Sequence, residues 1–256
     1  MTPMRMHFLS GGRLRLRRDL YYPTAERSEM IELPVSCVLF RHPQGNVLFD
    51  TGCHPSVVSD AAGRWGDLAR VMTAIMPEGD NVVTALAALD LAPTDIDVVV
   101  CSHLHTDHCG CNAFFTRATV VLHAREIAAA RSPTAKAQGY LAVDWDHPMP
   151  FDEISGERDL FADGRIVLLP LPGHTPGTLS ALVQLERSGT FLLASDTVSV
   201  RETLDDGLLP RNTWNADALE KSLAEIRHIA ARDVTVIYGH DDRQWQTLRK
   251  GADAYD

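Results

Sequence analysis

The chain has 256 residues, of which 45% are hydrophobic and 23% are charged, and these proportions exclude a disordered, collagen-like or coiled-coil chain. Its 24 basic and 34 acidic side chains give a net charge of −10, which disfavours binding to nucleic-acid phosphates. No apolar run approaches the roughly 18 residues of a membrane span. From the charge and from this pattern together, we expect neither nucleic acid nor a membrane as a partner.

Length and cysteine content predict one cytoplasmic domain. A chain of this size can form a single layered domain, and no linker interrupts it, so we predict one domain over residues 1–256. The basic N-terminal segment is not followed by the apolar stretch of a secretion signal. The cysteines are odd in number, which argues against a disulfide framework and for a reducing compartment. They are Cys37, Cys53, Cys101, Cys109 and Cys111.

The first elements expected along the chain are a β-hairpin and a helix. Apolar runs at 37–40 and 46–49 flank a turn that contains Pro43 and Gly45, which indicates two antiparallel strands. Residues 67–75 are predicted to form a helix within a longer excursion.

From Asn81 onward, helices and strands are predicted to alternate. Asn81 is the expected N-cap of a helix over 82–89. Three consecutive valines at 98–100 predict a buried strand, and apolar residues at helical intervals predict a helix over 216–231. Further strands are predicted at 120–122, 167–169, 180–183, 191–193 and 234–238.

A dense group of metal-ligand types follows the strand at 98–100. His103, His105, Asp107 and His108 lie within six residues. If the first two histidines continue the strand, their side chains share one face and can reach a single cation. The other two residues lie where the chain turns and can face a second cation. Imidazole and carboxylate suit zinc, and also iron, manganese or cobalt; a polar loop with chance histidines is the alternative.

Three further ligand types lie at the ends of other predicted strands. His174, Asp196 and His240 follow the strands at 167–169, 191–193 and 234–238. A single histidine in such a position is more often structural than a ligand. Several strand ends of the same character imply that these ends converge on one cleft.

This set resembles the metal-binding pattern of the metallo-β-lactamase-fold hydrolases. Within that superfamily the chain looks most similar to the N-acyl-homoserine lactone lactonases, the quorum-quenching branch. The similarity implies an α/β (α+β) fold, a four-layer αβ/βα sandwich of two mixed sheets with helices outside. The segments that carry this similarity, two of which contain the ligands His174 and His240, are Phe8–Gly12, Leu33–Val35, Asp50–Gly52, Gly173–Gly177 and Gly239–Asp241.

The resemblance also implies two divalent metal ions, with zinc as the first expectation, held by seven side chains. Three of them would bind one ion, three would bind the other, and one would bridge both. These are, respectively, His103, His105 and His174; Asp107, His108 and His240; and Asp196.

The chemistry expected of such a site is hydrolysis of a small lactone substrate. A hydroxide between the metals would attack the lactone carbonyl, because a bound metal lowers the pKa of water toward about 7. Asp107 would carry the proton to the leaving oxygen. Asp50 either orients a ligating histidine or caps the end of its strand, and the sequence favours neither.

Some positions near the predicted site differ from the lactonases. A tyrosine commonly lies three residues after their bridging aspartate, but Ser199 occupies that position here. Thr106 stands where they often have an aromatic residue. Both positions are expected to contact substrate, and Tyr140, Tyr238 or a water molecule could replace the missing hydroxyl.

Apolar residues and thiols near the site carry two interpretations each. Trp65, Met72 and Met76 precede the helix at 82–89. Trp65 is predicted to contact an acyl chain; the methionines either do the same or, as is more common, belong to the core or to a dimer contact. Cys109 and Cys111 are thiolate ligands, redox-active thiols or, more in keeping with a complete ligand set, small residues packed under the metal loop.

Other hydrolytic activities remain compatible with the same residues. The alternatives to acyl-homoserine lactones are a different, pyridoxolactone-like lactone and the thioester of a glyoxalase-type hydrolase. A non-catalytic scaffold would be expected to have lost ligands, and all seven are present. The sequence does not decide between a monomer and a homodimer.

Overall fold

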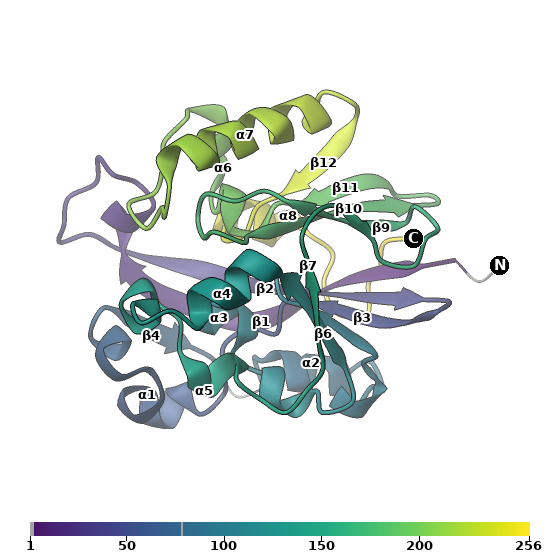
Figure 1. Cartoon of the computed structure of the whole chain (residues 1–256), viewed down its shortest axis with the longest axis horizontal. Coiled ribbons are helices and arrows are strands. Elements are labelled where there is room, and N and C mark those ends of the chain that lie inside the picture. Colours follow the sequence, from purple (N-terminus) through teal and green to yellow (C-terminus); the bar gives the residue numbers. More distant parts are fainter. Residues whose placement is uncertain (1–2, 78) are drawn as a thin grey trace.

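The computed structural model describes residues 3–77 and 79–256 and has two β-sheets packed face to face, with helices on their outer sides (Figure 1). The strand order is β4-β1-β2-β3-β5-β6-β7 in the larger sheet and β12-β11-β10-β9-β8 in the smaller one. Both sheets mix parallel and antiparallel pairs. The α/β sandwich expected from the sequence is therefore confirmed.

The larger sheet combines an antiparallel N-terminal half with a parallel half. Strands β1 to β3 pair antiparallel, whereas β3, β5, β6 and β7 run parallel. Its strands are β1 (Arg5–Arg17), β2 (Met30–His42), β3 (Gly45–Phe49), β4 (Met72–Ile75), β5 (Val98–Val100), β6 (Thr119–His123) and β7 (Phe151–Ile154).

The smaller sheet is antiparallel apart from its parallel pair β11 and β12. Its strands are β8 (Arg158–Asp159), β9 (Ile166–Pro170), β10 (Leu179–Leu185), β11 (Gly189–Leu193) and β12 (Val234–Ile237). The hairpin predicted at 37–49 is confirmed as β2–β3. The strands predicted at 180–183 and 191–193 are confirmed within the antiparallel pair β10 and β11.

Helices cover the outer sides of the sandwich. In Figure 1, α7 lies over the five-stranded sheet, and α1, α2 and α5 lie on the opposite side of the molecule. Asn81 caps α2 as predicted, because its side chain accepts a hydrogen bond from the Thr84 N–H. The helices are α1 (Val57–Trp65), α2 (Val82–Ala87), α3 (Thr106–Cys109), α4 (Ala124–Ala130), α5 (Ala142–Trp145), α6 (Arg201–Asp205), α7 (Ala216–Ala230) and α8 (Asp242–Thr247).

The core is divided into layers by the alternation of side chains along the strands. Phe8 and Phe40 point between the two sheets, where they pack with Leu168 and Phe191. Their neighbours Leu9 and Leu39 point the other way, into the layer beneath α2 and α4. A further layer joins the outer side of the smaller sheet to the apolar face of α7.

The helix predicted at 67–75 is wrong. This segment forms a short 3₁₀ helix, η2 (Gly66–Arg70), followed by the strand β4. β4 pairs antiparallel with residues 13–16 of β1. The apolar spacing fits a helix, but the unpaired edge of the long strand β1 supplies backbone hydrogen bonds that favour a strand.

The residues that flank the central strands of the two sheets meet at one edge of the sandwich. The Ser102 carbonyl, after β5, accepts a hydrogen bond from the Leu179 N–H at 2.8 Å. The Ser195 hydroxyl, after β11, donates to the Ser102 hydroxyl at 2.8 Å. These bonds join the two sheets where the predicted ligands begin.

The turn after β3 passes close to β1 where Gly52 of the turn faces Gly11 of the strand. Gly52 has φ of +72°, and a Cβ at this position would lie 2.5 Å from the Gly11 Cα. Only glycine fits both the left-handed conformation and this approach. The approach brings the turn after β3 under the loop that carries the ligands.

Among the helices that the structure describes, none combines the length and the apolar character required to cross a bilayer.

We predict that Gly52→Ala destabilises the protein more than Gly164→Ala. Both glycines have left-handed φ angles, +72° and +78°, so both alanines carry a similar backbone strain of roughly 1–2 kcal/mol. A Cβ at Gly164 meets nothing within 4 Å, whereas the contact at Gly52 adds about 1–3 kcal/mol of overpacking. Urea denaturation measures the difference, and equal losses in the two variants would show that the approach to Gly11 is not tight.

Candidate metal centre

The seven side chains predicted as metal ligands come together at the edge where β5, β11 and β12 end. Six of them are buried and His105 is half-buried. They form three overlapping groups in which all donor atoms lie within 4.8 Å of one another. The groups are His103, His105 and His174; Asp107, His108 and His240; and His103, His108 and Asp196.

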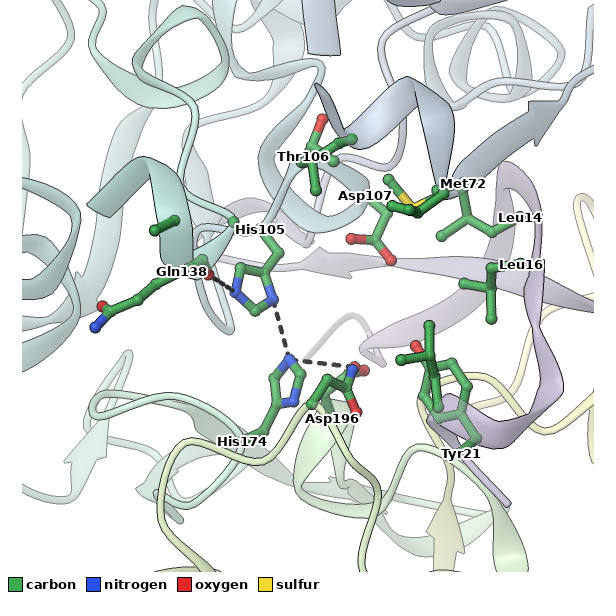
Figure 2. A pocket seen from close by; sticks show the side chains of 16 residues that line it. Leu14, Leu16, Tyr21, Met72, His105, Thr106, Asp107, Gln138, His174 and Asp196 are labelled. Atoms are coloured by element: carbon green, nitrogen blue, oxygen red, sulfur yellow. Dashed lines mark hydrogen bonds and ion pairs between the residues drawn. The ribbon is translucent and has the colours of Figure 1, made fainter. Parts of the chain in front are cut away.

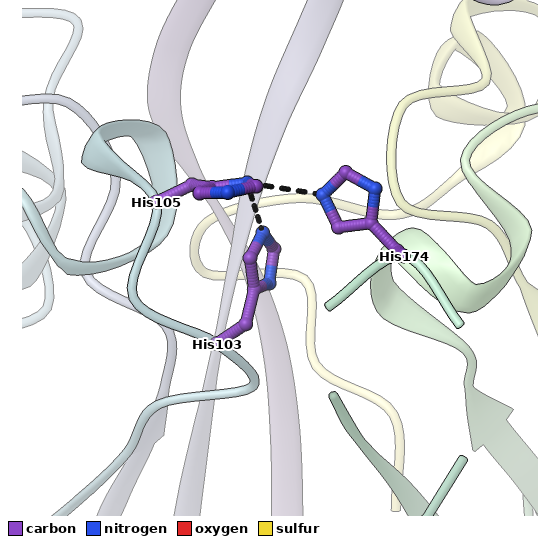
Figure 3. Close-up of side chains that lie close together, drawn as sticks. All are labelled: His103, His105 and His174. Carbon is purple, nitrogen blue, oxygen red and sulfur yellow. Dashed lines mark hydrogen bonds between the residues drawn. The ribbon is translucent and has the colours of Figure 1, made fainter. Parts of the chain in front are cut away.

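The first group consists of three imidazoles whose nitrogens converge (Figure 3). The Nε2 atoms of His103 and His174 lie 3.1 and 3.0 Å from Nδ1 of His105. The idea that His103 and His105 continue the strand is wrong, because β5 ends at Val100. An extended segment that follows the strand brings the two rings together instead.

The second group surrounds the Asp107 carboxylate. The Nε2 atoms of His108 and His240 each lie 3.5 Å from Asp107 Oδ2. Asp196 lies between the groups: one carboxylate oxygen is 3.0 Å from His240 Nε2, and the other is 3.5 Å from His174 Nε2. Asp196 can therefore contact both groups at once.

These separations fit two tetrahedral metal ions. In a tetrahedral zinc site with bonds of about 2.0–2.1 Å, neighbouring ligand atoms lie about 3.4 Å apart. The donor-atom pairs named above lie 3.0 to 3.5 Å apart, and all donor atoms of a group lie within 4.8 Å of one another.

Hydrogen bonds on the far side of the rings aim the free nitrogens at the site. His105 Nε2 donates to the Gln138 carbonyl at 3.0 Å, and His240 Nδ1 donates to the Pro34 carbonyl at 2.8 Å. A carbonyl oxygen only accepts, so the proton lies on the outer nitrogen and the inner one keeps its lone pair. Metal-binding histidines are oriented in this way.

The Asp50 carboxylate orients the third such ring. It accepts a hydrogen bond from His108 Nδ1 at 2.8 Å, and also from the backbone N–H and the hydroxyl of Ser102 at 2.7 Å each. Of the two interpretations left open by the sequence, the structure shows the orienting contact.

The carboxylates and buried histidines of the site provide an environment that favours cations. Burial lowers the pKa of His174 to about 3 despite the nearby Asp196 carboxylate, so its ring is neutral and free to bind a metal. Burial also acts to lower the pKa of His108, but the surrounding carboxylates, Asp107 first among them, raise it to about 10. A proton on the His108 ring balances the surrounding carboxylates, as the charge of a bound divalent ion would.

Three buried polar atoms of the site make no hydrogen bond within the described part of the chain. They are His108 Nε2, His240 Nε2 and Asp196 Oδ1, and each faces the others across the site. An unsatisfied buried polar atom costs roughly 1–3 kcal/mol, and more when it is charged. The residues present therefore fit a pair of divalent cations.

Glu126, which the sequence analysis missed, joins the two loops that carry the first group. Its buried carboxylate on α4 accepts hydrogen bonds from the Leu104 N–H at 3.0 Å, the Thr175 hydroxyl at 2.7 Å and the Gly177 N–H at 3.0 Å. The sequence feature that could have pointed to Glu126 is an acidic residue in an alanine-rich helix whose other buried residues are apolar.

A pocket opens from the metal groups and has two unlike walls (Figure 2). It encloses about 260 Å³. One wall consists of His105, Asp107, His174 and Asp196, and the other is aliphatic. The aliphatic residues are Leu14, Leu16, Leu20, Leu68, Val71 and Met72.

The three residues predicted to contact substrate lie in different places. Thr106 lines the pocket, although its hydroxyl donates to the buried Asp144 at 2.6 Å. Trp65 packs in the hydrophobic core behind the pocket and is 1% exposed. Ser199 is fully buried, and its hydroxyl donates to the Asp196 carbonyl at 3.5 Å.

The tyrosines considered as replacements at this position are held elsewhere, and a third one lines the pocket. The buried Tyr140 ring packs against His105, with 5.3 Å between the ring centroids, and burial next to Glu126 raises the pKa of its phenol. Tyr238 is half-buried beneath the Arg201 guanidinium, outside the pocket. Tyr21, which the sequence analysis did not consider, lies in the pocket beside Asp107 and Asp196.

The cysteines near the site are packing residues. Cys109 and Cys111 are fully buried, and their thiols donate to the carbonyls of His105 and Cys53. Burial raises the pKa of Cys111 to about 12, so the thiol stays neutral. None of the metal-binding groups among the described residues contains a cysteine.

The chain matches a known protein family and is similar over its full length to a curated protein. Residues 30–240 match the metallo-beta-lactamase superfamily. The chain is 31% identical to the N-acyl homoserine lactonase AttM of Azorhizobium caulinodans, with 100% of both chains covered.

Solved structures show the same architecture. An N-acyl homoserine lactone hydrolase with the product N-hexanoyl-L-homoserine bound at its catalytic metal centre superimposes with a TM-score of 0.90 at 25% identity, covering 100% of both chains. A mutant of AiiA from B. thuringiensis, with N-decanoyl-L-homoserine bound at its active site, gives the same TM-score, identity and coverage.

We predict that Asp50→Asn weakens metal binding, because the amide no longer orients His108 as a charged acceptor. Loss of such an orienting partner lowers metal affinity about 10- to 100-fold. Competition with a chromophoric zinc chelator measures the change. Asp163→Asn is the matched control, since Asp163 makes the same 2.8 Å contact with a histidine, His42, outside the centre. Equal zinc affinities in both variants would contradict the role of Asp50.

Proposed function

This chain belongs to the metallo-beta-lactamase superfamily and is a metal-dependent hydrolase of its lactonase branch, and on that premise we propose that it opens the ester ring of N-acyl homoserine lactones. Such a reaction inactivates the signal of quorum sensing and is therefore quorum quenching. The chain is proposed to act as one domain over residues 1–256.

The observation that carries the proposal is the pair of unlike walls in the pocket. The substrate has a polar lactone ring and an apolar acyl tail. The histidines and aspartates match the ring, and the aliphatic wall, from Leu14 and Leu16 to Met72, matches the tail. The structures of relatives with N-hexanoyl-L-homoserine at the catalytic metal centre and N-decanoyl-L-homoserine at the active site support a substrate of this class.

We propose that the seven predicted ligands hold two divalent ions, with zinc as the first candidate. Bound there, such ions supply Lewis-acid activation of the carbonyl and of water at neutral pH. One ion is assigned to His103, His105 and His174, the other to Asp107, His108 and His240, and Asp196 is assigned to both.

Asp107 is proposed to move the proton. It is the carboxylate of the second group that lines the pocket, and it retains 11% side-chain exposure there. When water adds to the carbonyl carbon, Asp107 accepts its proton, and the proton then passes to the ring oxygen as the carbon–oxygen bond breaks. The products are one hydroxyl group and one carboxylic acid, which releases its proton to solvent to give the carboxylate, so the atoms balance.

The first experiment measures hydrolysis by the zinc- or cobalt-loaded protein across a substrate panel. We expect acyl-homoserine lactones to be opened fastest, because they alone combine a lactone ring with an apolar tail. The panel also contains unrelated γ-lactones, a thioester and a β-lactam, with His108→Ala as the inactive control. Preference for another lactone or for the thioester would retain the site and refute this substrate assignment. A chelator should abolish turnover, and added metal should restore it.

We predict that Asp107→Asn lowers kcat at least about 100-fold, in line with the loss of a general acid–base group. The amide preserves the shape of the side chain but cannot carry the proton. Turnover is expressed per bound metal, since Asp107 is also a proposed ligand. Near-normal kcat in a metal-replete variant would rule out the proton role.

A further inference from the structure

Tyr21 occupies a position in the pocket that its sequence context does not suggest. It follows η1 (Arg18–Leu20), the short turn at the end of the long strand β1. Its side chain is buried, and its ring meets His240 edge-on with 5.9 Å between ring centroids. Figure 2 shows it across the cavity from His105, next to Asp196.

The other polar side chains considered for the pocket are already engaged or point away. The hydroxyl of Thr106 donates to Asp144. Gln138 directs its amide out of the cavity, as Figure 2 shows. Asp107 and Asp196 are acceptors when ionised. Among the described residues that line the pocket, Tyr21 and Asn212 remain as neutral side-chain donors.

These two side chains line the pocket together. Burial raises the pKa of the Tyr21 phenol, and the neighbouring Asn212 side chain acts to lower it as a hydrogen-bond donor would. When the amide N–H donates to the phenol oxygen, the phenol O–H proton is left to face the cavity. A phenol has an ordinary pKa of about 10 and is protonated at neutral pH, so it donates rather than accepts at this position.

The backbone holds both residues in place. The Leu20 carbonyl accepts a hydrogen bond from the Arg211 N–H at 2.8 Å, which joins the segments that carry Tyr21 and Asn212. The Arg211 guanidinium also donates to the Pro23 carbonyl at 2.9 Å and lies 3.7 Å from the buried Asp19 carboxylate. A donor fixed in this way loses little entropy when a ligand binds.

We propose that the Tyr21 hydroxyl donates a hydrogen bond to the carbonyl oxygen of the scissile ester, oriented by Asn212; this rests on the proposed hydrolase function. As water adds to the carbonyl carbon, negative charge develops on that oxygen and the hydrogen bond strengthens. Tyr21 keeps its proton throughout, and proton transfer to the leaving oxygen stays with Asp107. The residue therefore stabilises the transition state more than the bound substrate.

The test compares Tyr21→Phe with Tyr22→Phe in the zinc-loaded protein. Both variants remove one hydroxyl from the same turn, but that of Tyr22 donates to Glu202 at 3.2 Å, away from the cavity. With N-hexanoyl-L-homoserine lactone, Tyr21→Phe should lower kcat about 100-fold, as removal of one oxyanion donor does, with little change in KM. Tyr22→Phe should stay within about twofold of the wild type, and zinc content should be the same in all three proteins.

Two further measurements keep the outcome decisive. The ring-opened product N-hexanoyl-L-homoserine should bind Tyr21→Phe about tenfold more weakly than the wild type, consistent with a lost hydrogen bond to a charged group. Asn212→Ala, which retains the phenol but removes its orienting amide, should lower kcat by a smaller factor than Tyr21→Phe. This second variant tests the proposal if Tyr21→Phe loses zinc or unfolds.

The outcomes separate this proposal from the proposed function. If the wild type opens a different ester in the panel, the acyl-homoserine lactone assignment fails, and Tyr21 is judged by the same kcat ratio on that ester. Equal kcat in Tyr21→Phe and Tyr22→Phe would overturn the role of Tyr21 while leaving the hydrolase function intact. A wild type that neither hydrolyses the panel nor binds the product would overturn both.

Discussion

The organisation of this protein depends on a buried set of imidazole and carboxylate atoms that the described chain does not satisfy by itself. His108 Nε2 and His240 Nε2 lie 3.5 and 3.0 Å from the same Asp196 oxygen, and none of the three atoms makes a hydrogen bond within the described chain. Removing such groups from water is costly unless they find partners. Divalent cations are the partners whose charge and preferred ligands match this arrangement, and the same cations supply the reactivity proposed for the site.

The fold contributes to the site by bringing strand ends together and by fixing the side chains that follow them. Parallel pairing places the carboxyl ends of β3 and β5 side by side, and that of β11 next to β12. Asp50, after β3, then orients His108, while Glu126 ties the loop of His105 to that of His174. These partners explain why rings from distant parts of the sequence present lone pairs to one centre.

The pocket arises from a different part of the molecule. The extended end of β1 and its edge strand β4 project past the sandwich and supply the aliphatic wall. The turn that follows β1 brings Tyr21 against His240 at the metal groups. The strand ends thus carry the candidate metal ligands, whereas the β1 extension supplies Tyr21 and the aliphatic wall, so the wall residues can change while the metal centre is preserved.

The sequence by itself determined the strands and helices with strong periodicity and the seven candidate ligands, because closely spaced histidines after a valine-rich strand and ligand types at other strand ends are readable from local order. The sandwich fold followed from the resemblance of this pattern to a known family. It failed at 67–75, where the edge of β1 overrode helical spacing. It placed Trp65 against substrate, whereas the structure buries it in the core. Glu126 and Tyr21 emerged only from the tertiary structure, since their partners lie far away in the chain and distance in space is not encoded by local pattern.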